Sequence, residues 1–185
     1  YNLISSIDAN RVFDLSLEKP ATRDAYGHTS FGQSALLGRR LVEAGSTFVS
    51  VNWEEADSGN HWDLHANNFN MCRHHLPVLD AMITALIGDL DERGLLDTTL
   101  VVVMGEMGRT PTINKAKDGG RDHWGRAYSV LWAGCGVKNG VVIGATDKNA
   151  GEVIDAKASP DDIAATLYEA LGIPHDTVLD DIAGR

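Results

Sequence analysis

The chain has 185 residues, of which 43% are hydrophobic and 23% charged, and its formal net charge is −10. This length and composition predict one globular domain, and no apolar run approaches the length of a membrane span. The acidic balance argues against a general nucleic-acid binder, which would show a basic face. An anionic substrate would therefore have to be held by local positive charge or by a metal ion.

Cysteine usage excludes two further classes of protein. Cys72 and Cys135 are far apart, and neither belongs to a CxxC motif. A disulfide framework or a cysteine-rich zinc site is therefore not expected, and both residues are better explained as small buried hydrophobes. The chain begins at Tyr1 rather than at methionine, so the lack of a visible signal peptide leaves the compartment open.

The first clear elements are a helix and a strand. Thr29 and Ser30 can cap a helix over residues 30–44, and Gly45 stands where a left-handed residue often ends a helix. Residues 47–53 are then apolar and rich in β-branched types, which predicts a strand. A helix, a glycine and a strand make up half of a βαβ unit.

A first polar cluster follows this predicted strand. His61, Asp63 and His65 are spaced two residues apart, so in an extended segment their side chains point the same way. Imidazole nitrogen and carboxylate oxygen together suit zinc, manganese or iron better than calcium or magnesium. The position directly after a buried strand strengthens this otherwise common pattern.

The longest predicted helix covers residues 67–92. Its apolar residues recur at intervals of three and four, which predicts a face directed at the core. Pro77 falls inside this pattern and predicts a kink or a break near residues 73–76, because proline removes a backbone hydrogen bond.

A second polar cluster follows the run at residues 100–105, which resembles a strand buried on both faces of a parallel sheet. The cluster contains Glu106, Arg109, Arg121, Asp122 and His123. An ion pair that pins a loop could explain any one of these residues. The whole set, placed where ligands bind in open α/β sheets, predicts a functional site.

The rest of the chain continues the alternation of strands and helices. Residues 128–133 and 141–143 read as strands, and the Ser-Pro-Asp-Asp sequence at 159–162 predicts the start of a helix over 160–171. Together these elements predict a three-layer α/β fold, with a mostly parallel sheet covered by helices on both faces. Strands 47–53, 100–105 and 128–133 would be neighbours in it, and residues 1–185 would form a single domain.

Several motifs resemble the DUF1501 family, in the order in which that family has them. They are GEMGRTP at 105–111, GRDHW at 120–124, GATD at 144–147, WDLHANNF at 62–69 and SPDDIAATLYEALGI at 159–173. The resemblance implies a bacterial, sulfatase-like protein with an alkaline phosphatase-like core, of which this chain would be the C-terminal portion.

The same resemblance implies a set of metal ligands. Asp63, His65, Glu106 and His123 would stand at metal-binding positions of the alkaline phosphatase/sulfatase superfamily. Two departures matter. The superfamily commonly has Asp-His-Gly where this chain has Glu-Met-Gly from Glu106. The resemblance also implies that the nucleophile would lie in an N-terminal part outside this chain.

Three functions are therefore open. The first is a metal-dependent hydrolase of small sulfate or phosphate esters, in which Arg109 and Arg121 hold the oxygens of the anion. The second is a non-catalytic binding or structural module, and the third is another class of metalloenzyme. The expected cofactor is a divalent ion, zinc or manganese first, with calcium as an alternative. Neither a nucleic-acid partner nor a membrane span is expected, and the oligomeric state is left open.

Overall fold

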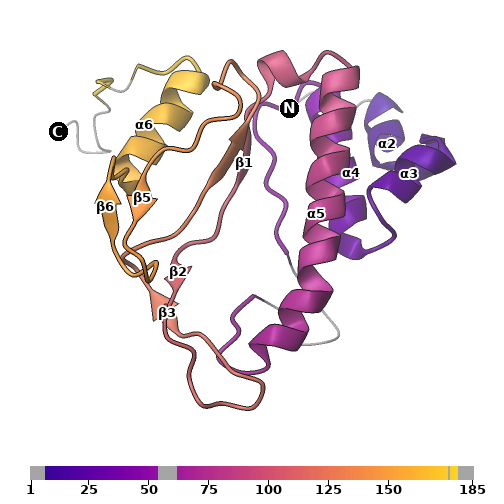
Figure 1. The fold of residues 1–185 in the computed structure, drawn as a ribbon. Coiled ribbons are helices and arrows are strands. Elements are labelled where there is room, and N and C mark those ends of the chain that lie inside the picture. The colour runs from indigo at the N-terminus through magenta and orange to yellow at the C-terminus, as the bar shows by residue number, and fades with distance from the viewer. Residues whose placement is uncertain (1–6, 54–61, 175, 179–185) are drawn as a thin grey trace, which may run out of the picture.

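The computed structural model describes residues 7–53, 62–174 and 176–178. Helices gather on one side of the molecule, and short strands with long loops form the other side (Figure 1). The helical side contains α2 (Ile7–Phe13), η1 (Leu15–Leu17), α3 (Pro20–Ala25), α4 (Ser30–Glu43), α5 (Asn68–Glu92) and η2 (Leu96–Thr98). The other side contains β1 (Val101–Val103), β2 (Gly108–Arg109), β3 (His123–Trp124), β4 (Leu131–Ala133), β5 (Ala145–Thr146), β6 (Val153–Asp155) and α6 (Pro160–Ala170).

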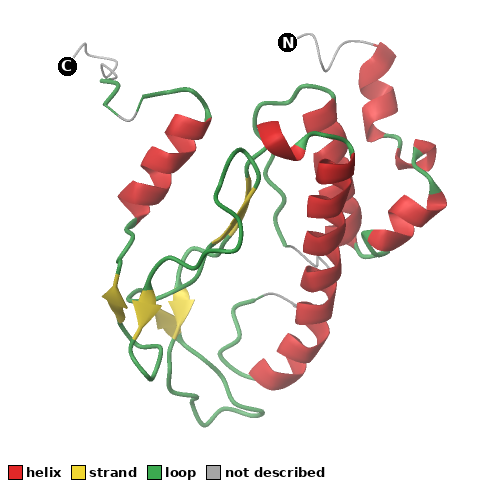
Figure 2. Cartoon of the chain, turned by 45° about the horizontal axis from the view of Figure 1, so that its top comes forward, coloured by secondary structure: helices red, strands yellow, loops and turns green. Residues whose placement is uncertain are grey.

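The predicted parallel sheet is wrong. The strands of the described residues form three separate two-stranded antiparallel sheets, β1 with β4, β2 with β3 and β5 with β6. Loops make up most of this side of the molecule, as Figure 2 shows. The three-layer α/β fold with an alkaline phosphatase-like core is therefore not the fold of this chain.

The pairing of β1 with β4 shows why the strand direction differs from the prediction. Val101 lies opposite Ala133, and Val103 lies opposite Leu131. Parallel neighbours need a crossover connection, which is usually a helix. Residues 104–130 contain no helix and instead run out through β2 and return through β3, so β4 comes back antiparallel to β1.

Two other predicted strands are absent. Residues 47–53 form no ladder and lie against α4, where a Cβ atom on Gly38 would come 3.2 Å from Cγ2 of Val51. Residues 141–143 are also irregular, and Val142 is 93% exposed. β-Branched side chains favour an extended backbone, but they do not supply a partner strand.

The three main predicted helices are confirmed as α4, α5 and α6. Thr29 accepts a hydrogen bond from the Gly32 N–H at 3.1 Å, and Ser159 and Asp162 form a reciprocal capping box before α6. The α5 helix continues through Pro77 without the predicted break. Its packing on α4 outweighs the one backbone hydrogen bond that proline removes.

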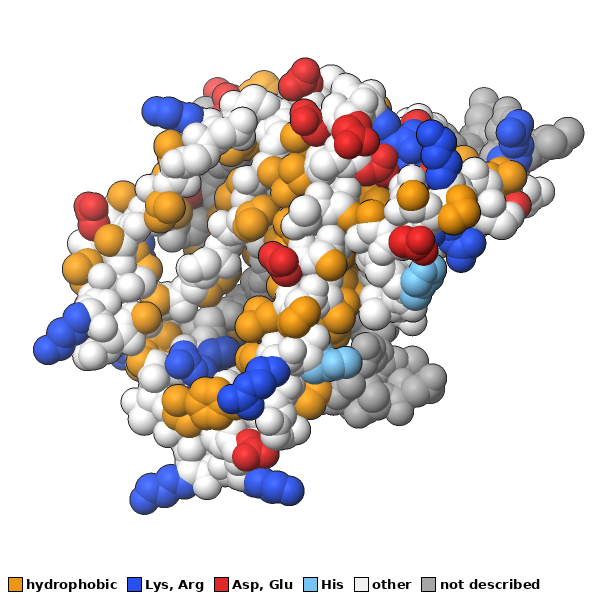
Figure 3. Space-filling model, turned by 45° about the vertical axis from the view of Figure 1, so that its right-hand side comes forward, with side chains coloured by type: hydrophobic (Ala, Val, Ile, Leu, Met, Phe, Trp, Pro, Cys, Tyr) orange, Lys and Arg blue, Asp and Glu red, His pale blue; other side chains and the backbone are white. Residues whose placement is uncertain are grey.

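The core lies on the helical side. Tyr26, Leu36 and Met82 are buried together, with Leu79 and Ile83 of α5 packed around them. On the other side many large apolar side chains stay at the surface, among them Val142, Ile143 and Ile154. Hydrophobic side chains also reach the surface on the helical side, which faces the viewer in Figure 3. None of the helices in the described ranges combines the length and apolar character that crossing a membrane requires.

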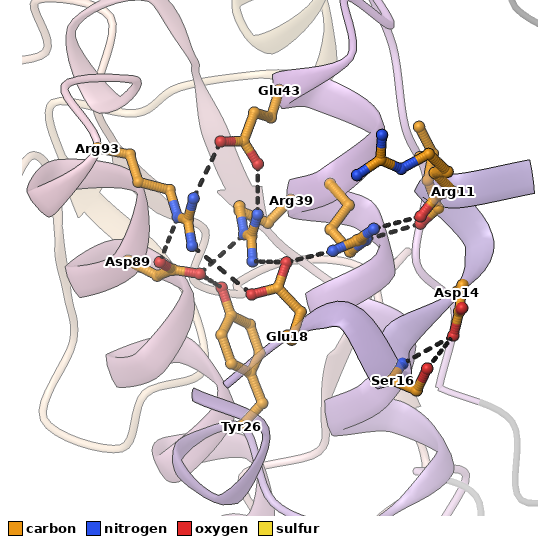
Figure 4. Close-up of polar contacts among 11 residues, drawn as sticks. Arg11, Asp14, Ser16, Glu18, Tyr26, Arg39, Glu43, Asp89 and Arg93 are labelled. Carbon is orange, nitrogen blue, oxygen red and sulfur yellow. Dashed lines mark hydrogen bonds and ion pairs between the residues drawn. The ribbon is translucent and has the colours of Figure 1, made fainter. Parts of the chain in front are cut away.

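A buried charged network joins α4 and α5 to the segments before them (Figure 4). The Arg39 side chain is fully buried and forms ion pairs with Glu18 at 2.8 Å, Glu43 at 2.5 Å and Asp89 at 2.8 Å. Burial disfavours the charge on Glu18, but hydrogen bonds from Arg39 and Arg40 outweigh it and hold the pKa of Glu18 below its ordinary value. The network therefore fixes α4, α5 and the N-terminal helices relative to one another.

Candidate metal centre

Asp63 and His65 lie in the irregular segment that precedes α5, in which the N–H groups of Leu64 and His65 each bond the carbonyl two residues before. Leu64 is buried, and the side chains on either side of it are about half exposed. Trp62 anchors the start of the segment, because its ring packs 5.0 Å from that of His75, a buried residue of α5. The two polar side chains are thereby held on the surface, on the same side of their segment.

The hairpin of β2 and β3 brings the other cluster to these residues. Arg109 and His123 are direct cross-strand partners, so their side chains leave the same face of the hairpin. Both reach the same oxygen, Oδ1 of Asp63, to which Arg109 Nη1 donates at 2.5 Å and His123 Nε2 lies at 2.8 Å. The antiparallel pair of β2 and β3 thus brings the two polar clusters together, which the prediction had assigned to neighbouring strands of a parallel sheet.

The loop that joins the two strands forms hydrogen bonds to the backbone carbonyls of Leu64 and His65. The Arg121 N–H donates to Leu64 O at 2.9 Å, and Asn114 Nδ2 donates to His65 O at 3.0 Å. Gly120 is buried against the same carbonyl, and a Cβ atom there would come 1.8 Å from His65 O. The close approach requires glycine, and it fixes the distance between the loop and the His65 segment.

Three side-chain atoms meet at this point. Oδ1 of Asp63 lies 3.0 Å from Nε2 of His65 and 2.8 Å from Nε2 of His123, and the two nitrogens lie 3.3 Å apart. Their side chains are 47% to 51% exposed, so solvent reaches the cluster. In the described part of the chain this is the one group of three or more His, Cys, Asp or Glu side chains arranged to hold a metal ion.

The charges around the cluster favour ionised carboxylates. Arg109, and after it His123, lower the pKa of Asp63 to about 2. The hydrogen bond from His65 likewise holds the pKa of Asp122 below its ordinary value. Both carboxyl groups are therefore acceptors only at neutral pH.

These acceptors determine the tautomers of the two rings when both are neutral. Nδ1 of His65 lies 2.7 Å from Oδ1 of Asp122, so Nδ1 carries the proton and the lone pair is on Nε2. Nε2 of His123 lies 2.8 Å from Oδ1 of Asp63 and 3.3 Å from Nε2 of His65, so an N–H there can donate to both acceptors. A metal ion bound at this point would take the place of that proton.

The structure brings together three of the four predicted metal ligands. Glu106 lies in the exposed loop between β1 and β2 and is not part of the group. Arg109 contacts Asp63, whereas the Arg121 charge acts on Cys72, whose pKa is raised because burial outweighs that charge. His61 lies outside the described residues. Asp122 belongs to the second predicted cluster, but its contact with His65 was not predicted, and Asn114 was not singled out at all.

Neither a curated protein nor a solved structure gave a match to the chain. The family model described as "Protein of unknown function (DUF1501)" matches residues 2–185. This match covers nearly the whole sequence and all of the motifs quoted above. It does not extend to the sulfatase-like superfamily. The chain is a member of the DUF1501 family.

Proposed function

We propose that the protein binds one divalent transition-metal ion through Oδ1 of Asp63 and Nε2 of His65 and His123. The observation that carries this proposal is the triangle of 2.8, 3.0 and 3.3 Å between these three atoms. Ligands that lie about 2.0–2.1 Å from an ion are about 2.8–3.0 Å apart on an octahedral face and about 3.3–3.4 Å apart in a tetrahedron. The triangle has the size that either geometry needs.

The donor set narrows the choice of metal. Two imidazoles and one carboxylate suit zinc, manganese or iron. Calcium takes six to eight oxygen ligands, and the group offers only one carboxylate. Zinc and manganese are therefore the proposed ions. Three protein ligands leave coordination positions open, and the half-exposed side chains direct them to solvent.

The reaction that we propose for the loaded centre is hydrolysis of a small anionic ester, a sulfate or a phosphate. When bound, the ion supplies a Lewis acid that polarises an ester oxygen. Arg109 supports this proposal, because its guanidinium lies at the centre and is 23% exposed. It can hold Asp63 in place and offer its remaining N–H groups to a non-bridging oxygen of the anion.

Metal titration tests the binding proposal. Metal-free protein is titrated with Co²⁺, followed by its visible spectrum, and the bound Co²⁺ is then displaced with Zn²⁺. We expect one equivalent bound. We expect His123→Gln to weaken binding by more than about 100-fold, since even changes to residues that only hydrogen-bond a metal ligand cost about 10- to 100-fold. His28→Gln is the matched control, because His28 is exposed and pairs with Asp24 in the helical half.

Two results would overturn the binding proposal. One is wild-type protein that binds no stoichiometric ion, and the other is an unchanged affinity in His123→Gln. Hydrolysis is then tested separately, with aryl sulfate and aryl phosphate esters and the zinc- and manganese-loaded protein. Turnover that Arg109→Met lowers without changing the metal content supports the ester reaction. Metal binding with no turnover on either ester favours the non-catalytic alternative.

A further inference from the structure

We infer that Asp122 is a positioning residue that fixes the orientation and the proton location of His65, and so leaves Nε2 of His65 free to act as a ligand. The inference rests on the proposed metal centre for its functional meaning. The contacts from which it is argued all lie within this chain and need no bound metal ion.

The first support is the contact itself. Oδ1 of Asp122 lies 2.7 Å from Nδ1 of His65, on the side of the ring opposite to the Asp63 and His123 contacts. An ionised carboxylate only accepts hydrogen bonds, so Nδ1 must be the donor. In a neutral ring the lone pair is then on Nε2, which is the atom that faces Asp63 and His123.

The second support is that Asp122 is itself held in place. Its N–H donates to Thr110 Oγ1 at 3.1 Å, and its C=O accepts from the Thr110 N–H at 2.9 Å. Asn114 Nδ2 lies 3.4 Å from the same Oδ1 and also binds the His65 carbonyl. The backbone of His65 and its ring are therefore fixed by one loop, which sets both the position and the rotation of the imidazole.

Metal-binding histidines generally donate their other ring N–H to a carboxylate, a carbonyl or water. That outer partner selects the tautomer and raises the basicity of the ligating nitrogen. Asp122 has this relation to His65, whereas in the described part of the chain no carboxylate has it to the second ring nitrogen of His123. His65 is therefore the pre-oriented ligand of the pair.

The test uses two readouts on the full chain. Long-range ¹H–¹⁵N spectra of metal-free protein at a pH of about 8, where imidazole is ordinarily neutral, report which nitrogen carries the proton, and His65→Gln identifies the signal. We expect wild-type His65 to be protonated at Nδ1 and this preference to be lost in Asp122→Ala. Co²⁺ affinity should fall about 10- to 100-fold in Asp122→Asn and Asp122→Ala.

The matched control is Asp118→Asn. Asp118 is exposed in the same loop and accepts from Asn70 at 2.8 Å, away from His65, so this change removes the same charge without touching the ring. It should leave the tautomer and the affinity unchanged. The inference is overturned if wild-type His65 is protonated at Nε2, or if Asp122→Ala leaves the Nδ1 tautomer in place. A wild-type protein with the Nδ1 tautomer but no metal affinity would overturn the proposed function and leave the orienting role of Asp122 standing.

Discussion

Oδ1 of Asp63 lies 2.8 Å from Nε2 of His123, although 60 residues separate the two in sequence. The contact depends on the β2–β3 hairpin, in which His123 stands opposite Arg109. It also depends on the loop between the strands, which binds the backbone of Leu64 and His65. The candidate centre therefore depends on the docking of one hairpin against the irregular segment that precedes α5.

Arg109→Met should raise the pKa of Asp63 from about 2 towards its ordinary value of 3.8, because Arg109 is the largest cause of the depression. His123 remains, so the recovery should be incomplete. A depressed carboxyl pKa stabilises the folded state above the ordinary pKa, and that contribution is lost as the pH falls from about 4 to about 2. Carboxyl ¹³C shifts of Asp63 measured against pH give both midpoints, and equal midpoints in the two proteins would contradict this assignment.

Gly120→Ala should destabilise the protein and disrupt the centre. The added Cβ would come 1.8 Å from His65 O, so the loop must move away from the segment that it holds. Overpacking of this kind typically costs about 1–3 kcal/mol of unfolding free energy. Gly125→Ala is the control, because nothing lies within 4 Å of its added Cβ. Urea unfolding and Co²⁺ titration of both variants measure the effect, and equal behaviour would show that the close approach is not required.

Arg39→Met should lower the unfolding free energy by roughly 3–5 kcal/mol, the usual cost of removing one partner from a buried ion network. The side chains of Glu18 and Asp89 are only 9% and 13% exposed, and their charges would remain without the cation between them. Arg126→Met removes an exposed ion pair to Glu152 and should have a much smaller effect, because solvent screens the pair. Urea midpoints of the two variants compare them directly. A loss at Arg39 no larger than that at Arg126 would mean that Arg40 and Arg93 compensate.

The helices could be predicted from sequence because their signals are local. Thr29 before α4 and the Ser159–Asp162 box before α6 bind backbone groups within one turn, so sequence alone contains the whole interaction. The predicted break near Pro77 failed for the opposite reason. The burial of Met82 and its neighbours against α4 favours the continuation of α5. That packing joins residues far apart in the chain, so the local sequence does not predict it.

The strand direction could have been questioned from the sequence. A parallel pairing of residues 100–105 with 128–133 required a helical crossover, yet the glycine-rich and polar stretch between them has no helical period. The apolar run at 47–53 carries no such warning, because a strand and an extended segment packed on a helix have the same composition. Contacts with α4 distinguish them, such as those of Val51 with Gly38 and of Trp53 with Phe31.

The candidate site was predictable in part. The spacing of Asp63 and His65 predicts that their side chains point the same way, and in the structure the two lie 3.0 Å apart, although their segment is bent rather than a strand. His123 joins them through a hairpin that the sequence did not indicate, and Glu106 does not join them. Side-chain partners such as Asp122 depend on how a loop folds back, which residue spacing does not encode.

The most direct test of the central claim is a crystal structure of zinc-saturated protein, with the ion located by anomalous scattering at the zinc edge. The proposal predicts one ion, bonded at about 2.0–2.1 Å to Oδ1 of Asp63 and to Nε2 of His65 and His123. An ion bound elsewhere would contradict it. So would a saturated crystal in which these three atoms contact only one another.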